Sequence, residues 1–101
     1  MKVYIVIGLT GEYSDKYEWL VKGFISKDKA KSFQSKCTEF AEEYEKFLAT
    51  ESYDDLSYTE KTDMQQAQIS NSPDKYFTRD YTGTFYDISE VEVEEEVEWK
   101  I

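Results

Sequence analysis

The sequence predicts an α+β protein in which a three-stranded antiparallel or mixed sheet, in the order β-β-α-(α)-β, carries a long amphipathic helix on one face. Three observations predict this architecture: two apolar segments joined by a short glycine-containing loop, an apolar stripe at helical spacing, and a final segment of alternating acidic and apolar residues. A length of 101 residues corresponds to one domain, which we expect to span residues 1–101.

The first two segments predict a β-hairpin. Residues 2–7 are nearly all apolar and β-branched or aromatic, which is typical of a strand that is covered on both faces or lies centrally in a sheet. A polar loop over residues 8–15 leads to a second strand over residues 16–25, and so short a connection predicts antiparallel pairing. Strict alternation would place one set on one face, Tyr17, Trp19, Val21 and Ile25, and the other set opposite, Glu18, Leu20, Lys22 and Phe24.

A long helix is predicted over residues 27–50. Ser26 has the character of an N-cap, and Asp28 places a negative charge in the first turn, where it favours the helix dipole. Apolar residues recur at spacings of three and four, so we expect this stripe to pack on the hairpin sheet: Ala30, Phe33, Cys37, Phe40, Ala41, Tyr44, Phe47 and Leu48. Cys37 lies within the stripe, which predicts a buried structural thiol and fits a reducing compartment.

Residues 51–83 carry fewer structural signals. Ser57 and Glu60 match a capping box, which predicts a short helix over residues 60–69. Residues 71–74 form a predicted turn that contains the only proline, Pro73.

The final segment, residues 86–101, is predicted to be a strand with two chemically opposite faces. Five glutamates share one parity: Glu90, Glu92, Glu94, Glu96 and Glu98. The other parity is apolar except for Glu95: Val91, Val93, Val97, Trp99 and Ile101. We expect this strand to pair with residues 2–7 and to turn its glutamates to solvent, opposite the long helix. Glu95 would then require a β-bulge or a frayed end near residues 94–96.

The net charge of −10 is unevenly distributed. Residues 1–36 sum to +3, and residues 37–101 sum to −13. Such a surface repels nucleic acid and anionic membranes and favours basic protein partners, although acidity also keeps a small domain soluble. The sequence has no apolar run long enough for a membrane span, and we expect a cytoplasmic location.

Catalytic and metal-binding patterns are absent from the sequence. The chain has no histidine, which excludes histidine bases, Ser-His or Cys-His nucleophile pairs and histidine metal ligands. Residues 8–11 lack the lysine of a phosphate loop, and alternate strand glutamates point in parallel instead of converging on one ion. We therefore expect a non-catalytic protein without a cofactor or metal.

A hairpin signature of T-G-E-Y-S-D over residues 10–15 followed by Glu18-Trp19, with D-Y-T-G over residues 80–83, resembles a group of small uncharacterised proteins of phages and prophages. The resemblance covers the first thirty-odd residues best and the last twenty more loosely. It implies a mobile-element setting, and hence the cytoplasm of a host cell, but no activity. The long acidic ending departs from the shorter endings of that group.

Two functions remain open at this point. The first is an inhibitor that imitates nucleic acid and engages a basic host protein, such as a CRISPR or restriction nuclease. Its phosphate-like surface would be the glutamate row extended by further acids: Glu39, Glu42, Glu43, Asp54 and Asp55. The second is an interaction or oligomerisation module, a homodimer included, that uses the last strand as an edge and the aromatic hairpin, with Tyr13 at its tip.

Overall fold

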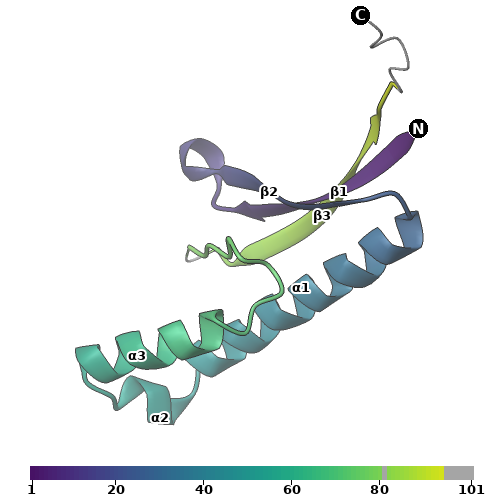
Figure 1. The fold of residues 1–101 in the computed structure, drawn as a ribbon. Helices are drawn as coiled ribbons and strands as arrows, with labels where there is room; N and C mark the ends of the chain where they lie inside the picture. The colour runs from purple at the N-terminus through teal and green to yellow at the C-terminus, as the bar shows by residue number, and fades with distance from the viewer. Residues whose placement is uncertain (81, 95–101) are drawn as a thin grey trace, which may run out of the picture.

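A computed structural model of the chain describes residues 1–80 and 82–94 and confirms the predicted α+β fold (Figure 1). The sheet has the strand order β2-β1-β3, and both pairings are antiparallel. The strands are β1 (Lys2–Thr10), β2 (Tyr17–Phe24) and β3 (Thr84–Glu92), and a 3-10 turn, Tyr13–Asp15, lies in the hairpin loop. The apolar first segment is therefore the central strand, as its composition predicts.

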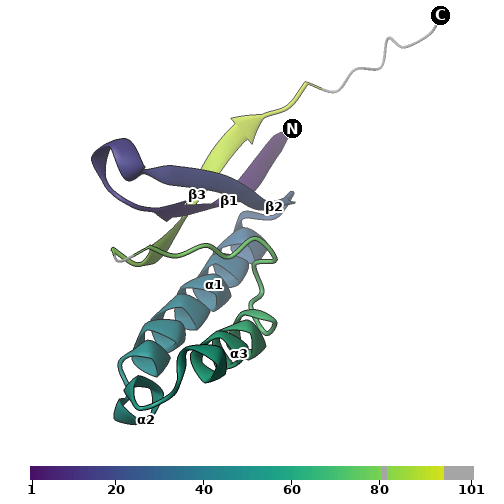
Figure 2. The same ribbon diagram turned by 90° about the vertical axis from the view of Figure 1, so that its left-hand side faces the viewer.

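The helix α1 (Lys27–Leu48) runs beneath the sheet and covers one of its faces (Figures 1 and 2). It begins as predicted, because the Ser26 side chain accepts a hydrogen bond from the backbone N–H of Lys29. The first half of its predicted stripe packs on the sheet, where Ala30 and Cys37 are fully buried beside Val6 of β1. This part of the stripe therefore builds the hydrophobic core. The later aromatic residues of the stripe do not pack on the sheet as predicted: Phe40 and Tyr44 contact Phe77, and Phe47 contacts Tyr53.

Two further helices follow α1 and lie away from the sheet (Figure 2). The short α2 (Glu51–Asp54) has no counterpart among the predicted elements. The next, α3 (Tyr58–Ile69), begins at the predicted capping box, in which the Ser57 hydroxyl accepts from the Glu60 N–H and the Glu60 carboxylate accepts from the Ser57 N–H. The helix thus starts two residues before the predicted residue 60, because the N-cap residue immediately precedes the first turn.

An irregularity in β2 corrects the predicted faces of that strand. The register of β2 against β1 shifts between Val6 and Ile7, which pair with Lys22 and Leu20, so Val21 is an additional residue on β2. A bulge of this kind reverses the alternation beyond it. Phe24 therefore joins Trp19 on the helix-covered face instead of lying opposite, whereas Ile25 follows the strand and is exposed.

The register of β3 shows that the predicted face of the glutamates is wrong, although Glu90, Glu92 and Glu94 are exposed to solvent as predicted. Glu90 pairs with Tyr4, and the same parity places Tyr86 and Ile88 in the core against α1. Val91 takes the other parity and lies on the face opposite α1. The large side chains of Tyr86 and Ile88 determine which parity faces inward, and the alternation of acidic and apolar residues, which begins only at Glu90, does not include them. Residues 95–101, including the bulge predicted at Glu95, lie outside the described residues.

A buried carboxylate connects the sheet to the segment after α3. Asp74, 1% exposed, accepts hydrogen bonds through Oδ2 from Trp19 Nε1 at 2.9 Å and from the Tyr86 hydroxyl at 2.8 Å. Its Oδ1 accepts from the backbone N–H of Tyr76 at 2.9 Å. Trp19 and Tyr86 come from the two edge strands, and each is paired with Gly8 of the central strand. Asp74 therefore links the two edge strands through Trp19 and Tyr86, the residues that flank Gly8 on either side.

Gly8 provides the space for this arrangement. A Cβ atom at Gly8 would lie 2.2 Å from Cε2 of Trp19, so any side chain there would displace the indole. We predict that Gly8→Ala destabilises the fold by about 1–3 kcal/mol, measured by urea denaturation. Gly23→Ala is the matched control on β2, because its Cβ would make only ordinary contacts, the nearest 3.6 Å from Val3. Equal losses in the two variants would contradict the prediction.

We predict that Asp74→Ala lowers the free energy of unfolding by about 3 kcal/mol, because it leaves the indole N–H and the Tyr86 hydroxyl without acceptors in a buried site. Burial, followed by the charge of Asp74, raises the pKa of Cys37 to about 12. Because burial is the larger cause and persists in the variant, the thiol should react with a thiol reagent at pH 8 only modestly faster in Asp74→Ala than in wild type. Asp63→Ala, an exposed change on α3, is the control and should alter neither measurement appreciably.

Candidate binding surface

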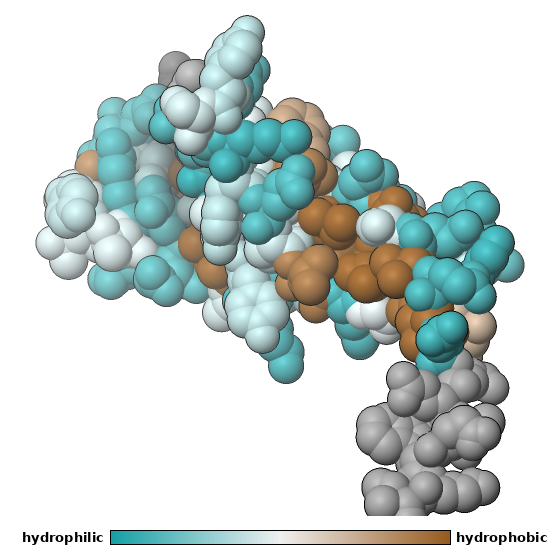
Figure 3. Space-filling model, turned by 90° about the horizontal axis from the view of Figure 1, so that it is seen from above, coloured by the Kyte–Doolittle hydropathy of each residue, from teal (hydrophilic) through white to brown (hydrophobic). Residues whose placement is uncertain are grey.

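The face of the sheet turned away from α1 is apolar and uncovered by any described element. Figure 3 views the molecule from this side and shows hydrophobic residues gathered over the sheet. We call this surface the open face. Pairing registers assign its apolar residues to all three strands: Val3, Ile5, Ile7 and Leu9 of β1, Leu20 of β2, and Phe85 and Val91 of β3.

Exposure on the open face increases from the centre to the edges. The β1 residues are half-buried between their neighbours, whereas Leu20 is 67% exposed and Phe85 is 63% exposed. A hollow of about 190–210 Å³ is present at each edge, and the one at β2 is lined by Ile7, Glu18, Trp19 and Leu20. The open face therefore offers both a continuous apolar strip and a recess beside Leu20.

Two carboxylates stand at the edges of the open face, and we call them the acidic rim. Glu18 on β2 pairs with Leu9, and Asp87 on β3 pairs with Ile7. Lys16 lies 3.3 Å from Glu18, and the Asp87 carboxylate accepts a hydrogen bond from the Ile88 N–H at 2.8 Å. The apolar strip is therefore flanked by Asp87 at one edge and by Glu18, in an ion pair with Lys16, at the other.

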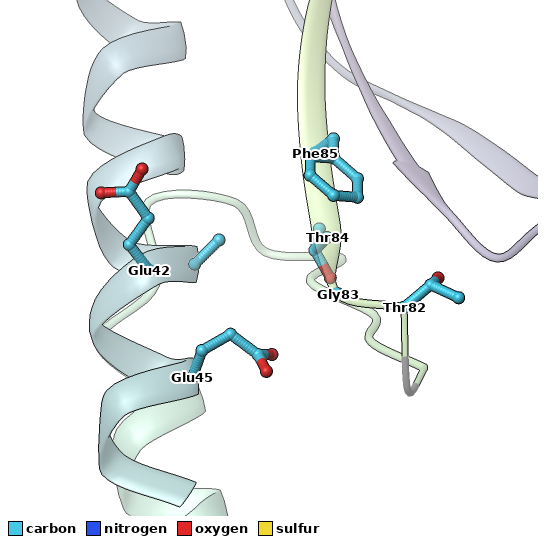
Figure 4. A pocket seen from close by; sticks show the side chains of 7 residues that line it. Glu42, Glu45, Thr82, Gly83, Thr84 and Phe85 are labelled. Carbon is cyan, nitrogen blue, oxygen red and sulfur yellow. The ribbon is translucent and has the colours of Figure 1, made fainter. Parts of the chain in front are cut away.

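The hollow at the β3 edge has an acidic wall (Figure 4). Glu45 projects from α1 toward Thr82 and Thr84, whereas Glu42 lines the same hollow with its carboxylate directed along the helix. Glu45 is engaged by Arg79, whose Nη2 donates to Glu45 Oε1 at 2.9 Å; this hydrogen bond lowers the pKa of Glu45. Glu42 is exposed, so it adds an available negative charge beside Phe85.

The free edge of β3 is partly occupied by side chains. Gln34 of α1 donates from Nε2 to the Tyr86 carbonyl at 2.8 Å. The neighbouring N–H of Ile88 donates to Asp87. Backbone groups at these two positions are therefore already satisfied, which disfavours addition of a partner strand along the middle of this edge.

The two loop segments of the phage-protein resemblance lie together at one end of the sheet. Thr10 donates to the Gly83 carbonyl at 2.6 Å, and Asp80 accepts from the Thr82 N–H at 2.8 Å. Hydrogen bonds from Thr82, first from its side chain and then from its backbone, lower the pKa of Asp80. Gly83 has φ +89°, a conformation that favours glycine. These residues hold the hairpin loop against the start of β3.

The residues predicted to contact a partner do not form one surface. Glu90 lies 3.5 Å from Lys2, and Glu92 lies 3.2 Å from the Met1 amino group, so each is ion-paired on the helix side of the sheet. Glu94 is exposed, whereas Glu96 and Glu98 lie outside the described residues. The remaining acids are exposed on the helices and the turn after α2: Glu39, Glu42, Glu43, Asp54 and Asp55.

Tyr13 is 93% exposed at the tip of the hairpin loop, with φ 55°. Its exposure fits the predicted role as a contact residue but does not test it. The open face is the surface that sequence reasoning missed. The apolar residues at alternate positions of β1 indicate such a face, but the sequence prediction places the glutamates of β3 on it.

Comparison with known proteins returned no match to any family, to any curated protein or to any solved structure. Within residues 1–80 and 82–94, no three potential metal-ligating side chains lie close enough together to hold an ion. None of the helices in that part of the chain is both long and apolar enough to cross a membrane.

We predict that the double variant Leu20→Thr/Phe85→Thr remains folded, with a loss of about 1 kcal/mol or less, because both side chains are mostly exposed and threonine suits a strand. The variant should bind the neutral apolar dye Nile red several-fold less than wild type, because the strip is interrupted at both edges. Tyr58→Gln/Met64→Gln removes two exposed apolar side chains from α3 and is the control. Equal dye loss in both variants would show that the open face is not the apolar binding surface.

Proposed function

We propose that this chain is a non-catalytic binding protein that docks a basic protein partner on the open face of its sheet, in the phage or prophage setting that its hairpin signature implies. The observation that carries the proposal is the continuous apolar strip on the face opposite α1. A single exposed apolar residue is ordinary on a protein surface, but a contiguous patch framed by polar groups is typical of an interaction site.

Hydrophobic burial supplies the affinity in this proposal. Leu20 and Phe85 each expose almost two-thirds of their surface. Covering both would contribute roughly 2–4 kcal/mol, since full burial of such a side chain is worth about 1.5–3 kcal/mol. The half-buried residues of β1 add to this total without further ordering, because the sheet already holds them in place.

Charge supplies the selectivity. The chain carries a net charge of −10, and the acidic rim and Glu42 adjoin the apolar strip. A basic partner is attracted at long range and gains ion pairs at the edges of the contact, whereas an acidic surface is repelled. In this proposal the acids provide the specificity for a basic partner, and the apolar strip provides the affinity.

Nucleic-acid mimicry toward a host nuclease is the second candidate. The exposure of Glu39, Glu42 and Glu43 along α1 favours it, although Lys46 lies 3.8 Å from Glu43. Against it, Glu90 and Glu92 are ion-paired with Lys2 and the Met1 amino group, which reduces their net negative charge. The two candidates differ in which side chains a partner requires.

Affinity capture with matched variants separates the two candidates. Wild type, Leu20→Thr/Phe85→Thr, Tyr58→Gln/Met64→Gln and Glu39→Gln/Glu42→Gln/Glu43→Gln are used as baits in bacterial lysate, and captured proteins are quantified by mass spectrometry. We expect a basic protein that the wild-type and α3-variant baits retain and the open-face variant loses by at least ten-fold. Binding is then repeated with that protein purified.

A partner that the open-face variant binds as well as wild type would overturn the proposed function. Loss confined to the glutamine variant, with release of the partner at 0.5 M salt, would instead establish mimicry, because salt screens exposed charges much more than apolar contacts.

A further inference from the structure

We infer that the partner element which occupies the open face is a single amphipathic helix with an apolar stripe flanked by lysine or arginine, lying along β1. This inference rests on the proposed function and adds the form and charge of the occupant.

The open face has the dimensions of one helix. Nine residues of β1 span about 30 Å, and three strands at about 4.8 Å spacing are roughly 14 Å wide. A helix with its side chains is about 10–12 Å across, and about 20 residues extend 30 Å. The 22-residue α1 occupies the opposite face of the same sheet in this way. A second helix would complete a layered arrangement in which the apolar central strand is covered on both faces.

A second copy of the chain fits this surface poorly. Two open faces packed together would bring together two proteins of net charge −10. The acidic rim of each copy would also approach the acids of the other, which is unfavourable. Self-association by this face is therefore disfavoured by charge.

A strand added along the middle of the β3 edge also fits poorly. The β3 edge is engaged at the Tyr86 carbonyl by Gln34 and at the Ile88 N–H by Asp87. A helix satisfies its own backbone and needs only an apolar contact, so it can dock without any free strand edge.

The acidic rim sets the charge of the flanking residues. Glu18 and Asp87 lie on the two edge strands, which are separated by about 10 Å across β1. That spacing matches the width of one helix, so cations on either side of its apolar stripe would lie above the two carboxylates. Glutamates at the same helix positions would be repelled.

Three synthetic peptides of about 20 residues test the inference against purified full-length protein, with affinity measured by fluorescence anisotropy. The first has a leucine stripe flanked by lysines, the second has the same stripe flanked by glutamates, and the third has the composition of the first in scrambled order. We expect the lysine-flanked peptide to bind at least ten-fold more tightly than either of the others. Leu20→Thr/Phe85→Thr should weaken that binding at least ten-fold, and Tyr58→Gln/Met64→Gln should leave it unchanged.

The acidic rim has its own matched control. Glu18→Gln/Asp87→Asn removes two charges and keeps an acceptor for the Ile88 N–H, and it should reduce the preference for lysine over glutamate flanks about three- to ten-fold. Glu39→Gln/Glu43→Gln is the control, because it removes two charges from α1. Glu43 is ion-paired with Lys46, as Glu18 is with Lys16, and this variant should change the preference for lysine flanks by less than two-fold.

Several outcomes would overturn the inference. Equal binding of all three peptides would exclude a helix of defined pattern. Dimerisation that Leu20→Thr/Phe85→Thr abolishes would identify a second copy as the occupant, and peptide binding that appears only in Trp99→Ser would identify the chain's own end. If the peptides fail while the captured basic protein still requires Leu20 and Phe85, the inference fails and the proposed function stands. If the peptides fail and the captured basic protein does not require Leu20 and Phe85, the inference and the proposed function both fail.

Discussion

The hydrogen bonds to the buried Asp74 carboxylate are the constraint on which the rest of this structure depends. Trp19 and Tyr86 donate to the same oxygen from opposite edges of the sheet, and both aromatic rings lie on the side of α1. A buried carboxylate without such partners would be strongly unfavourable, so the two donors and the segment around Asp74 have to be placed together. Their placement determines which face of the sheet becomes the core.

That choice of face leaves the opposite one open. Tyr86 and Ile88 take the inward parity on β3, so Phe85, Asp87 and Val91 must face outward. The central strand is apolar on both sides, and only one side is covered by α1. An apolar face with an acidic rim is the direct consequence, and the proposed binding function follows from it without any catalytic group.

Much of the fold was predictable because its signals are local. Caps at Ser26 and Ser57, the stripe of α1 and the hairpin depend on residues within a few positions of one another. Register depends on contacts that are distant in sequence. The bulge at Val21 reversed the faces of β2 beyond it, and its position depends on the pairing of β2 with β1. The glutamates were placed on the wrong face because Tyr86 and Ile88, not the glutamates, decide the orientation of β3.

The sequence by itself determined the α+β class, the central position of residues 2–7, the helix boundaries near Ser26 and Ser57, and the strong net acidity, since each follows from composition or short-range periodicity. Only the tertiary structure decided that Asp74 is buried, that Glu90 and Glu92 are ion-paired, and that the apolar residues of β1 and the edges of its neighbours form one uncovered face. The physical reason is that hydrogen bonds, ion pairs and strand registers join residues up to 92 positions apart, which no local pattern specifies.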